Sequence, residues 1–277
     1  MNAKVKKRVF AILKYVILIL LAVIWLIPIF TLVFTAVKSK QDFFTGNLLS
    51  LPSHIEWSNF TNAMTKGRMF KYMKNDLIIS ILKVPLGIFL SAMVSFALTR
   101  LHLKNRTGWL VFFLVGMMLP MQIALVPISI IYNKFHLINT YFGLFYVYIG
   151  FGISFMVLVT QGFMKSIPKA IDEAAYIDGA SKWQTFVSVI LPISKPALAT
   201  LFITDFLATW NEYLLASVII NDNDLKTVPV GLMTFVGEHG TDYGYLCAGV
   251  LVAVIPVMVV YLIFQNYFVE GMAGAVK

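Results

Sequence analysis

The stretch EAAYIDGASKWQTFVSVILPISKP, from Glu173 to Pro196, is polar where the sequence on both sides is strongly apolar. It begins with an acid and alanines, which favour the first turns of a helix. Gly179 then permits a tight turn. A second run follows, with Trp183, Phe186, Val187 and Ile190 at helical spacing, and prolines limit it. The stretch therefore predicts a helix, a turn and a second helix that leads into an apolar segment.

From the residues alone, two roles for this element remain open. It could be a surface helix pair that only links two apolar segments. It could also be a docking element, because a helix presented between two anchored segments suits a groove on a soluble partner.

The composition places the whole chain in a membrane. It has 277 residues, of which 59% are hydrophobic and 13% charged, whereas soluble domains are about half apolar and a quarter charged. The net charge of +9 could suggest nucleic acid. However, the cations lie at the ends of apolar runs, and no basic face with interleaved aromatic residues is present. We therefore expect a lipid bilayer around the chain and no nucleic-acid partner.

A helix needs about 20 apolar residues to cross the hydrocarbon core of a bilayer. Six segments meet this condition, and they define an all-α, polytopic membrane protein with a domain over residues 10–268. The expected spans are Phe10–Val37, Asp76–Leu98, Trp109–Tyr132, Tyr141–Phe163, Ala197–Ile220 and Tyr245–Phe268. Residues 1–9 and 269–277 form the two tails. We expect the loop over residues 38–75 to lie outside and to form short helices.

Lysine and arginine are enriched in cytoplasmic loops of membrane proteins. Here they gather at the amino end, in the loop after the second span and in the loop over residues 164–196. This distribution predicts that both termini and the Glu173–Pro196 stretch are cytoplasmic. The outer loop over 38–75 is an exception, because it carries six basic residues.

Motifs for chemistry within the chain are missing. Cys247 is the single cysteine, and the four histidines are scattered without ligand spacing. No G-x-x-x-x-G-K-[ST] sequence occurs, so the chain has no phosphate-binding loop of its own. We expect no catalytic residue, no metal site and no cofactor in this chain.

The quoted stretch resembles the EAA loop of permease subunits in bacterial ABC importers. That pattern has Glu-Ala-Ala, a glycine six positions after the glutamate, then an apolar residue, any residue and Leu-Pro. Val189 stands where isoleucine is commoner, and the other positions match at Glu173, Ala174, Ala175, Gly179, Leu191 and Pro192. The segments FALTRLHLKNRTG, LVPISIIYNKFHLINTYFGL, WNEYLLA and GMAGAVK are similar to the carbohydrate-uptake branch, of maltose and multiple-sugar type.

The resemblance implies a type I importer permease fold in a bacterial cell membrane. Its implied partners are a second permease subunit, an ABC ATPase dimer that holds ATP and Mg, and an extracytoplasmic sugar-binding protein. The helix after Glu173 would be the coupling helix that sits in a cleft of the ATPase. The implied contact residues are Glu173, Ala174, Ala175, Asp178, Gly179, Ala180, Leu191 and Pro192, with Gly271, Gly274 and Lys277 of the tail reaching the ATPase dimer.

Charged residues inside membrane spans usually face the bundle interior or water. Lys83 and Asp205 are such residues, and they would line the pathway or pair within the complex, although snorkelling explains Lys83 equally well. The expected spans place them about 10 Å apart along the membrane normal, which argues against direct pairing. Trp210, Asn211 and Glu212 could contact sugar, and Trp210 could instead anchor at the interface.

Two other functions are open to a polytopic membrane protein. A secondary transporter driven by an ion gradient would show repeated halves, and no internal repeat is visible here. A membrane-embedded enzyme would need a histidine cluster or a nucleophile motif within the spans, which the sequence lacks. The sequence does not name the transported sugar.

Overall fold

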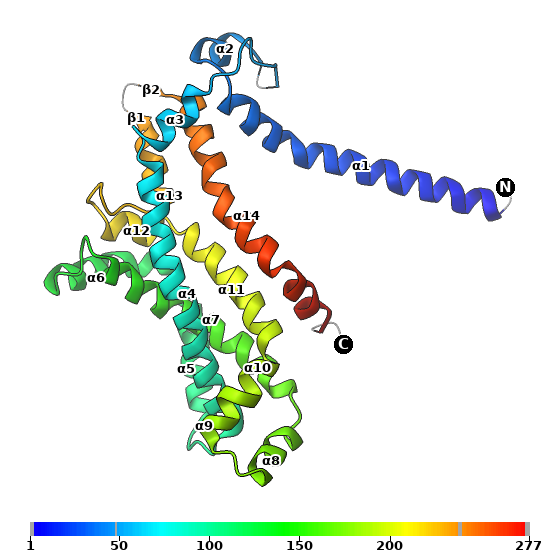
Figure 1. Cartoon of the computed structure of the whole chain (residues 1–277), viewed down its shortest axis with the longest axis vertical. Coiled ribbons are helices and arrows are strands. Elements are labelled where there is room, and N and C mark those ends of the chain that lie inside the picture. Colours follow the sequence, from blue (N-terminus) through cyan, green and yellow to red (C-terminus); the bar gives the residue numbers. More distant parts are fainter. Residues whose placement is uncertain (1–2, 48, 238–239, 275–277) are drawn as a thin grey trace. The chain divides into compact units, whose positions relative to one another are not determined.

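The computed structural model describes residues 3–47, 49–237 and 240–274, and nearly all of this chain is helical (Figure 1). Within these residues, the strands are β1 (Val236–Gly237) and β2 (Gly240–Thr241), which pair antiparallel as one small hairpin. The all-α prediction is confirmed.

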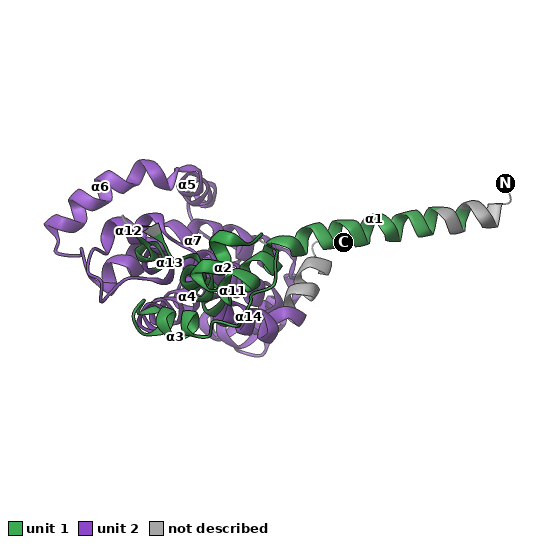
Figure 2. Cartoon of the chain, turned by 90° about the horizontal axis from the view of Figure 1, so that it is seen from above, with its two compact units in different colours: residues 1–69, 232–253 green, residues 70–231, 254–277 purple. Residues whose placement is uncertain are grey.

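The chain divides into two compact units (Figure 2). Unit 1 combines residues 1–69 with 232–253, and unit 2 combines residues 70–231 with 254–277. Unit 2 contains the Glu173–Pro196 stretch and both predicted intramembrane charges.

Unit 1 contains α1 (Ala3–Ala36), α2 (Lys40–Thr45), α3 (Ser58–Met64) and the first part of α14 (Tyr243–Gly274). The two short helices lie in the loop that was expected to form them. The buried Asn59 amide ties this loop to the end of α1, since its Nδ2 donates to the carbonyl oxygens of Ala36 and Lys38 at 3.0 and 2.9 Å. Along α1 the apolar side chains from Phe10 onward are mostly exposed.

Unit 2 is built on three long helices with shorter ones between them. The long helices are α4 (Met69–Arg100), α7 (Tyr141–Ser166) and α11 (Lys195–Trp210). The others are α5 (Arg106–Met118), α6 (Met121–Lys134), α8 (Ala170–Ile177), α9 (Lys182–Gln184), a π-helical turn (Thr185–Ile190), α10 (Leu191–Ile193), α12 (Leu214–Ile219) and α13 (Val228–Leu232).

Within the described residues, four helices are long and apolar enough to span a membrane. The number rises to six if each of two bent pairs is one span: α5 with α6, and Lys182–Ile193 with α11, which meet at 72°. The third predicted span is not continuous, because α5 and α6 meet at 93°. Pro120 explains the break: it lacks an N–H group, and its ring forces Leu119 into an extended conformation with ψ 118°. The fifth predicted span, Ala197–Ile220, also breaks, because α11 ends at Trp210 and α12 begins at Leu214.

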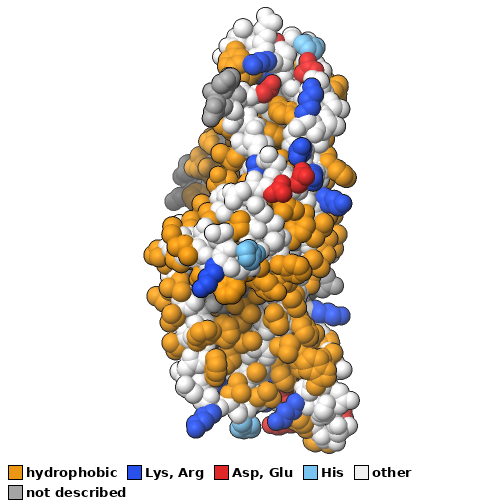
Figure 3. Space-filling model, turned by 90° about the vertical axis from the view of Figure 1, so that its left-hand side faces the viewer, with side chains coloured by type: hydrophobic (Ala, Val, Ile, Leu, Met, Phe, Trp, Pro, Cys, Tyr) orange, Lys and Arg blue, Asp and Glu red, His pale blue; other side chains and the backbone are white. Residues whose placement is uncertain are grey.

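The outer surface of unit 2 suits lipid or another apolar partner. Figure 3 shows hydrophobic side chains spread over the face that includes α6. The most exposed ones on α5 and α6 include Phe112, Met118, Ile123, Val126 and Ile130, each at least 64% exposed. A water-facing surface of this kind would be costly, so the structure supports a multi-pass membrane protein.

Candidate coupling element and membrane cavity

The predicted turn after the first helix of the Glu173–Pro196 stretch is present. Gly179 has φ +81°, a conformation that L side chains rarely adopt. Its N–H donates to the Tyr176 carbonyl at 3.0 Å, and the Ala180 N–H donates to the Ala175 carbonyl at 2.9 Å. These two bonds form a Schellman motif, which ends α8 at a defined residue. Gly179 therefore fixes the direction in which the chain leaves α8.

One face of α8 is exposed and the other is buried. Glu173, Ala174, Asp178 and Gly179 are exposed, together with Tyr176 (45%) and Ile177 (86%). Ala175 was expected at the partner contact, but it is buried within the chain. In a helix of 3.6 residues per turn, Ala175 falls on the face opposite Ile177, and its contact with a partner stays a prediction.

The second part of the Glu173–Pro196 stretch, from Lys182 onward, packs against the membrane helices. Its start at Lys182 is fixed by a capping box, in which Ser181 and Gln184 exchange side-chain and backbone hydrogen bonds. A buried cluster then joins this part to α4 and α7, and it comprises Ala92, Phe96, Met164, Ile167, Phe186 and Ile190. Leu191 packs against this cluster, whereas Pro192 is exposed and Ala180 is half-buried. Leu191 is thus only partly buried within the chain, and its contact with a partner stays a prediction.

An ion pair that sequence reasoning missed holds α8 to α4. Arg100, the last residue of α4, places its Nε 3.1 Å from Asp172 Oδ2 and donates from Nη2 to the Ile167 carbonyl at 2.8 Å. Both side chains are close to nine-tenths buried. Burial raises the pKa of the Asp172 carboxyl, and the Arg100 guanidinium opposes that rise.

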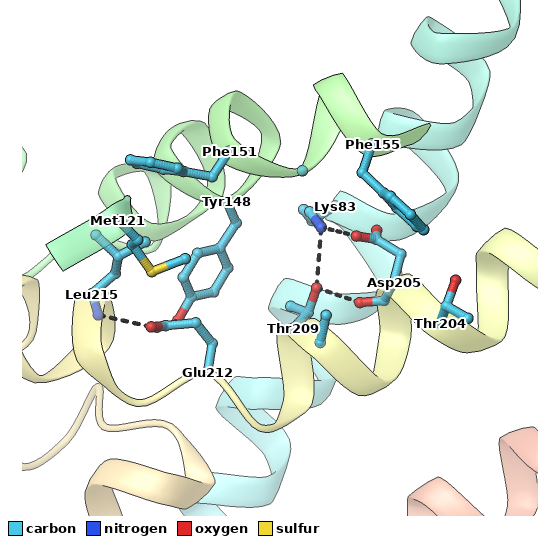
Figure 4. Close-up of a pocket in the computed structure, with 12 residues that line it drawn as sticks. Lys83, Met121, Tyr148, Phe151, Phe155, Thr204, Asp205, Thr209, Glu212 and Leu215 are labelled. Atoms are coloured by element: carbon cyan, nitrogen blue, oxygen red, sulfur yellow. Dashed lines mark hydrogen bonds and ion pairs between the residues drawn. The ribbon is translucent and has the colours of Figure 1, made fainter. Parts of the chain in front are cut away.

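A cavity of about 280 Å³ lies within unit 2 (Figure 4). Helices α4, α6, α7, α11 and α12 supply its walls. Its lining combines apolar and aromatic side chains with a few polar groups, which is the usual make-up of a small-molecule site. The lining residues are Lys83, Met121, Tyr148, Phe151, Gly152, Phe155, Thr204, Asp205, Ala208, Thr209, Glu212 and Leu215.

Lys83 and Asp205 pair directly at this cavity, contrary to the expectation from the predicted spans. Lys83 Nζ lies 2.5 Å from Asp205 Oδ1 and donates to Thr209 Oγ1 at 3.2 Å (Figure 4). The expectation failed because the helices differ from the predicted spans. α4 begins at Met69 rather than at residue 76, and α11 stops at Trp210. Both charges are buried, so snorkelling does not describe Lys83.

Glu212 also lines the cavity, and its carboxylate has a local structural role. It accepts hydrogen bonds from the Tyr148 hydroxyl and from the backbone N–H groups of Leu215 and Ala216, at 2.8, 2.8 and 3.0 Å. These contacts satisfy the first amides of α12. Glu212 therefore both borders the cavity and starts the helix after the break.

Trp210 and Asn211 do not line this cavity. Trp210 is buried and stacks on Phe206 with ring centroids 5.6 Å apart. The Asn211 side chain donates to the Leu207 carbonyl at 2.9 Å. Of the five residues expected on a substrate path, the structure brings Lys83, Asp205 and Glu212 together.

The carboxyl tail is described only in part. α14 ends at Gly274. The expected ATPase contacts at Gly271 and Gly274 lie where side-chain surroundings are not described, and Lys277 lies outside the described residues. Within the described part of the chain, no group of three or more His, Cys, Asp or Glu side chains could hold a metal ion.

Comparison with known proteins identifies the family. Residues 83–273 match the family model described as the binding-protein-dependent transport system inner membrane component. The chain belongs to this family.

Relatives of this inner membrane component are similar to it in sequence over most of its length. The probable ABC transporter permease protein YurM of Bacillus subtilis is 36% identical over 90% of this chain and 83% of the relative. The probable starch degradation products transport system permease protein AmyC of Thermoanaerobacterium thermosulfurigenes is 33% identical, over 94% of each chain.

A solved structure supports the same fold. It is a bacterial ABC transporter that imports the acidic polysaccharide alginate, with a TM-score of 0.82, 22% identity, and coverage of 95% of this chain and 98% of that one. The predicted permease of a binding-protein-dependent importer is confirmed, as is its fold.

Proposed function

We propose that this inner membrane component is one of two permease subunits of an ATP-driven importer of sugars or oligosaccharides. A separate ABC ATPase dimer would bind ATP and Mg and supply the energy. An extracytoplasmic binding protein would deliver the sugar. Both termini and α8 would then face the cytoplasm of a bacterial cell, as the distribution of lysine and arginine favours.

The observation that carries the proposal is the exposed face of α8. Ile177 is 86% exposed beside Tyr176 and Glu173 on a helix whose end is fixed by Gly179. An exposed isoleucine on a short, well-anchored helix suits a groove on a soluble partner. We propose that Glu173, Ala174, Tyr176, Ile177 and Asp178 form the contact with the ATPase, and that this subunit has no catalytic residue.

The cavity supports a substrate path within this subunit. Asp205 Oδ2 is buried and has no hydrogen-bond partner among the described residues. Thr204 and Thr209 add hydroxyl oxygens, and Phe151 and Phe155 add apolar surface. Acceptors and aromatic rings suit the hydroxyl groups and apolar face of a sugar ring. The exposed apolar side chains of α5 and α6 suit lipid and a second permease subunit.

A single-cysteine cross-link tests the ATPase contact. Cys247 is the one cysteine in the chain, so Cys247→Ser gives a cysteine-free background. We expect Ile177→Cys in that background to cross-link to a co-expressed ABC ATPase. Gln41→Cys, which is exposed in the outer loop, is the control and should not cross-link. Equal cross-linking at both positions, or none at Ile177→Cys, would contradict the proposed contact.

A further inference from the structure

A polar link between the loop that carries α8 and the membrane helices lies at the end of α4. Arg100 contacts two separate parts of the loop that carries α8: the Ile167 carbonyl before it and Asp172 within its first turn. Among the described residues, the Asp172 carboxylate accepts no hydrogen bond from another side chain. Arg100 is thus the side chain with which Asp172 forms its ion pair.

The surroundings make this pair sensitive to change. The side chains of Arg100 and Asp172 are 7% and 11% exposed. An exposed ion pair contributes little, but the loss of one partner of a buried pair leaves a charge without compensation. The nearby buried cluster contains Ala92 and Phe96 of α4 with Met164, Ile167, Phe186 and Ile190. The end of α4 therefore packs together with the loop on both sides of α8.

The same helix reaches the cavity. Lys83 lies 17 residues before Arg100 on α4, about 25 Å along a helix with a 1.5 Å rise per residue. There it pairs with Asp205 of α11. α4 thus carries two buried ion pairs: Arg100 at the end of α4 pairs with α8, and Lys83 pairs with α11 at the cavity. Figure 4 shows the second pair.

We propose that the Arg100–Asp172 pair is the joint through which a displacement of α8 moves α4 and so changes the cavity. Arg100 and Asp172 are positioning residues. Asp172 lies on the buried side of α8 and Arg100 at the end of α4, and neither needs a contact with the ATPase or the sugar. This inference rests on the proposed function and assigns a role that the Glu-Ala-Ala pattern does not include.

The test uses the full complex with its ATPase and binding protein in proteoliposomes. The variants are Arg100→Gln, Asp172→Asn and the double variant, with Arg106→Gln as a control at an exposed arginine in the same region. The three readouts are co-purification with the ATPase, basal ATP hydrolysis, and the stimulation of hydrolysis by sugar-loaded binding protein.

We expect the single variants to co-purify with the ATPase and to keep basal hydrolysis. Their stimulation should fall about fivefold or more, the usual scale of coupling between two sites. The double variant should be no worse than the singles, because residues that act as a pair are not additive. The control should behave as the wild type.

Two results would overturn the proposal that the Arg100–Asp172 pair is this joint. Stimulation equal to wild type in both single variants would show that α4 is driven by another route. Loss of ATPase co-purification in both would show that the pair only shapes the docking surface. If the wild-type chain itself fails to co-purify with an ATPase, the proposed function fails instead, so the two failures are distinguishable.

Discussion

Lys83 and Asp205 form a buried ion pair at 2.5 Å that joins α4 to α11 at the edge of a membrane cavity. Each partner explains why the other is tolerated inside a span, since charged groups there are costly unless paired. The space around the pair is tightly packed. A Cβ atom added at Gly152 would lie 3.2 Å from Lys83 Nζ and 3.4 Å from Asp205 Oδ1.

Removing one partner should therefore cost more than removing both. We expect Lys83→Met or Asp205→Leu alone to destabilise the protein by about 3–5 kcal/mol, because each leaves an uncompensated buried charge. The double variant should recover part of this loss. Thermal unfolding of the purified complex in detergent measures all three. Strictly additive losses in the double variant would contradict a functional ion pair.

Substitution of Gly179 should destabilise the turn after α8, because other residues rarely adopt its backbone conformation. No atom lies within 4 Å of an added Cβ, so the cost arises from φ +81° alone. We expect Gly179→Ala to cost about 1–2 kcal/mol of local stability, and Gly179→Pro to cost more, because proline fixes φ near −65° and removes the N–H that bonds to Tyr176. Hydrogen exchange of the α8 amides measures the effect.

Gly162 provides the matched control for Gly179. It lies within α7, also has no atom within 4 Å of an added Cβ, and has no positive φ. Gly162→Ala should be neutral or slightly stabilising, since alanine is the better helix former. If Gly162→Ala and Gly179→Ala loosen α8 equally, the turn conformation is not what anchors it.

Filling the cavity should block transport without dissociating the complex. Ala208 lines the cavity and is exposed to it, so Ala208→Trp would occupy much of a volume of about 280 Å³. We expect sugar uptake to fall about tenfold or more, because the indole side chain would leave little of the cavity for a sugar ring. Ala208→Ser is the control. Unchanged uptake with Ala208→Trp would remove the cavity from the sugar path.

The sequence predicted the parts of the fold that depend on composition and local pattern. Long apolar runs indicated the spans, and Gly179 in a helix-favouring stretch indicated the turn. Pro120 could have signalled the break between α5 and α6, but a proline inside a membrane helix usually produces only a kink. The start of α12 after the break involves hydrogen bonds from its amides to Glu212, contacts that have no separate sequence signal.

Contacts between distant residues were the main part that the sequence could not provide. Arg100 and Asp172 are 72 positions apart, and Lys83 and Asp205 are 122 apart. Their pairing depends on how α4 packs against α8 and α11, which helical periodicity does not specify. The exposure of Ile177 and the burial of Ala175 likewise depend on which face of α8 meets the cluster around Phe186.

The measurement that tests the account most directly is sugar uptake into proteoliposomes that contain this chain and its partner permease, with and without the ATPase subunits. The account predicts uptake only when the ATPase, ATP and sugar-loaded binding protein are all present, and a large loss with Glu173→Ala. Uptake driven by an ion gradient in the absence of any ATPase would contradict it.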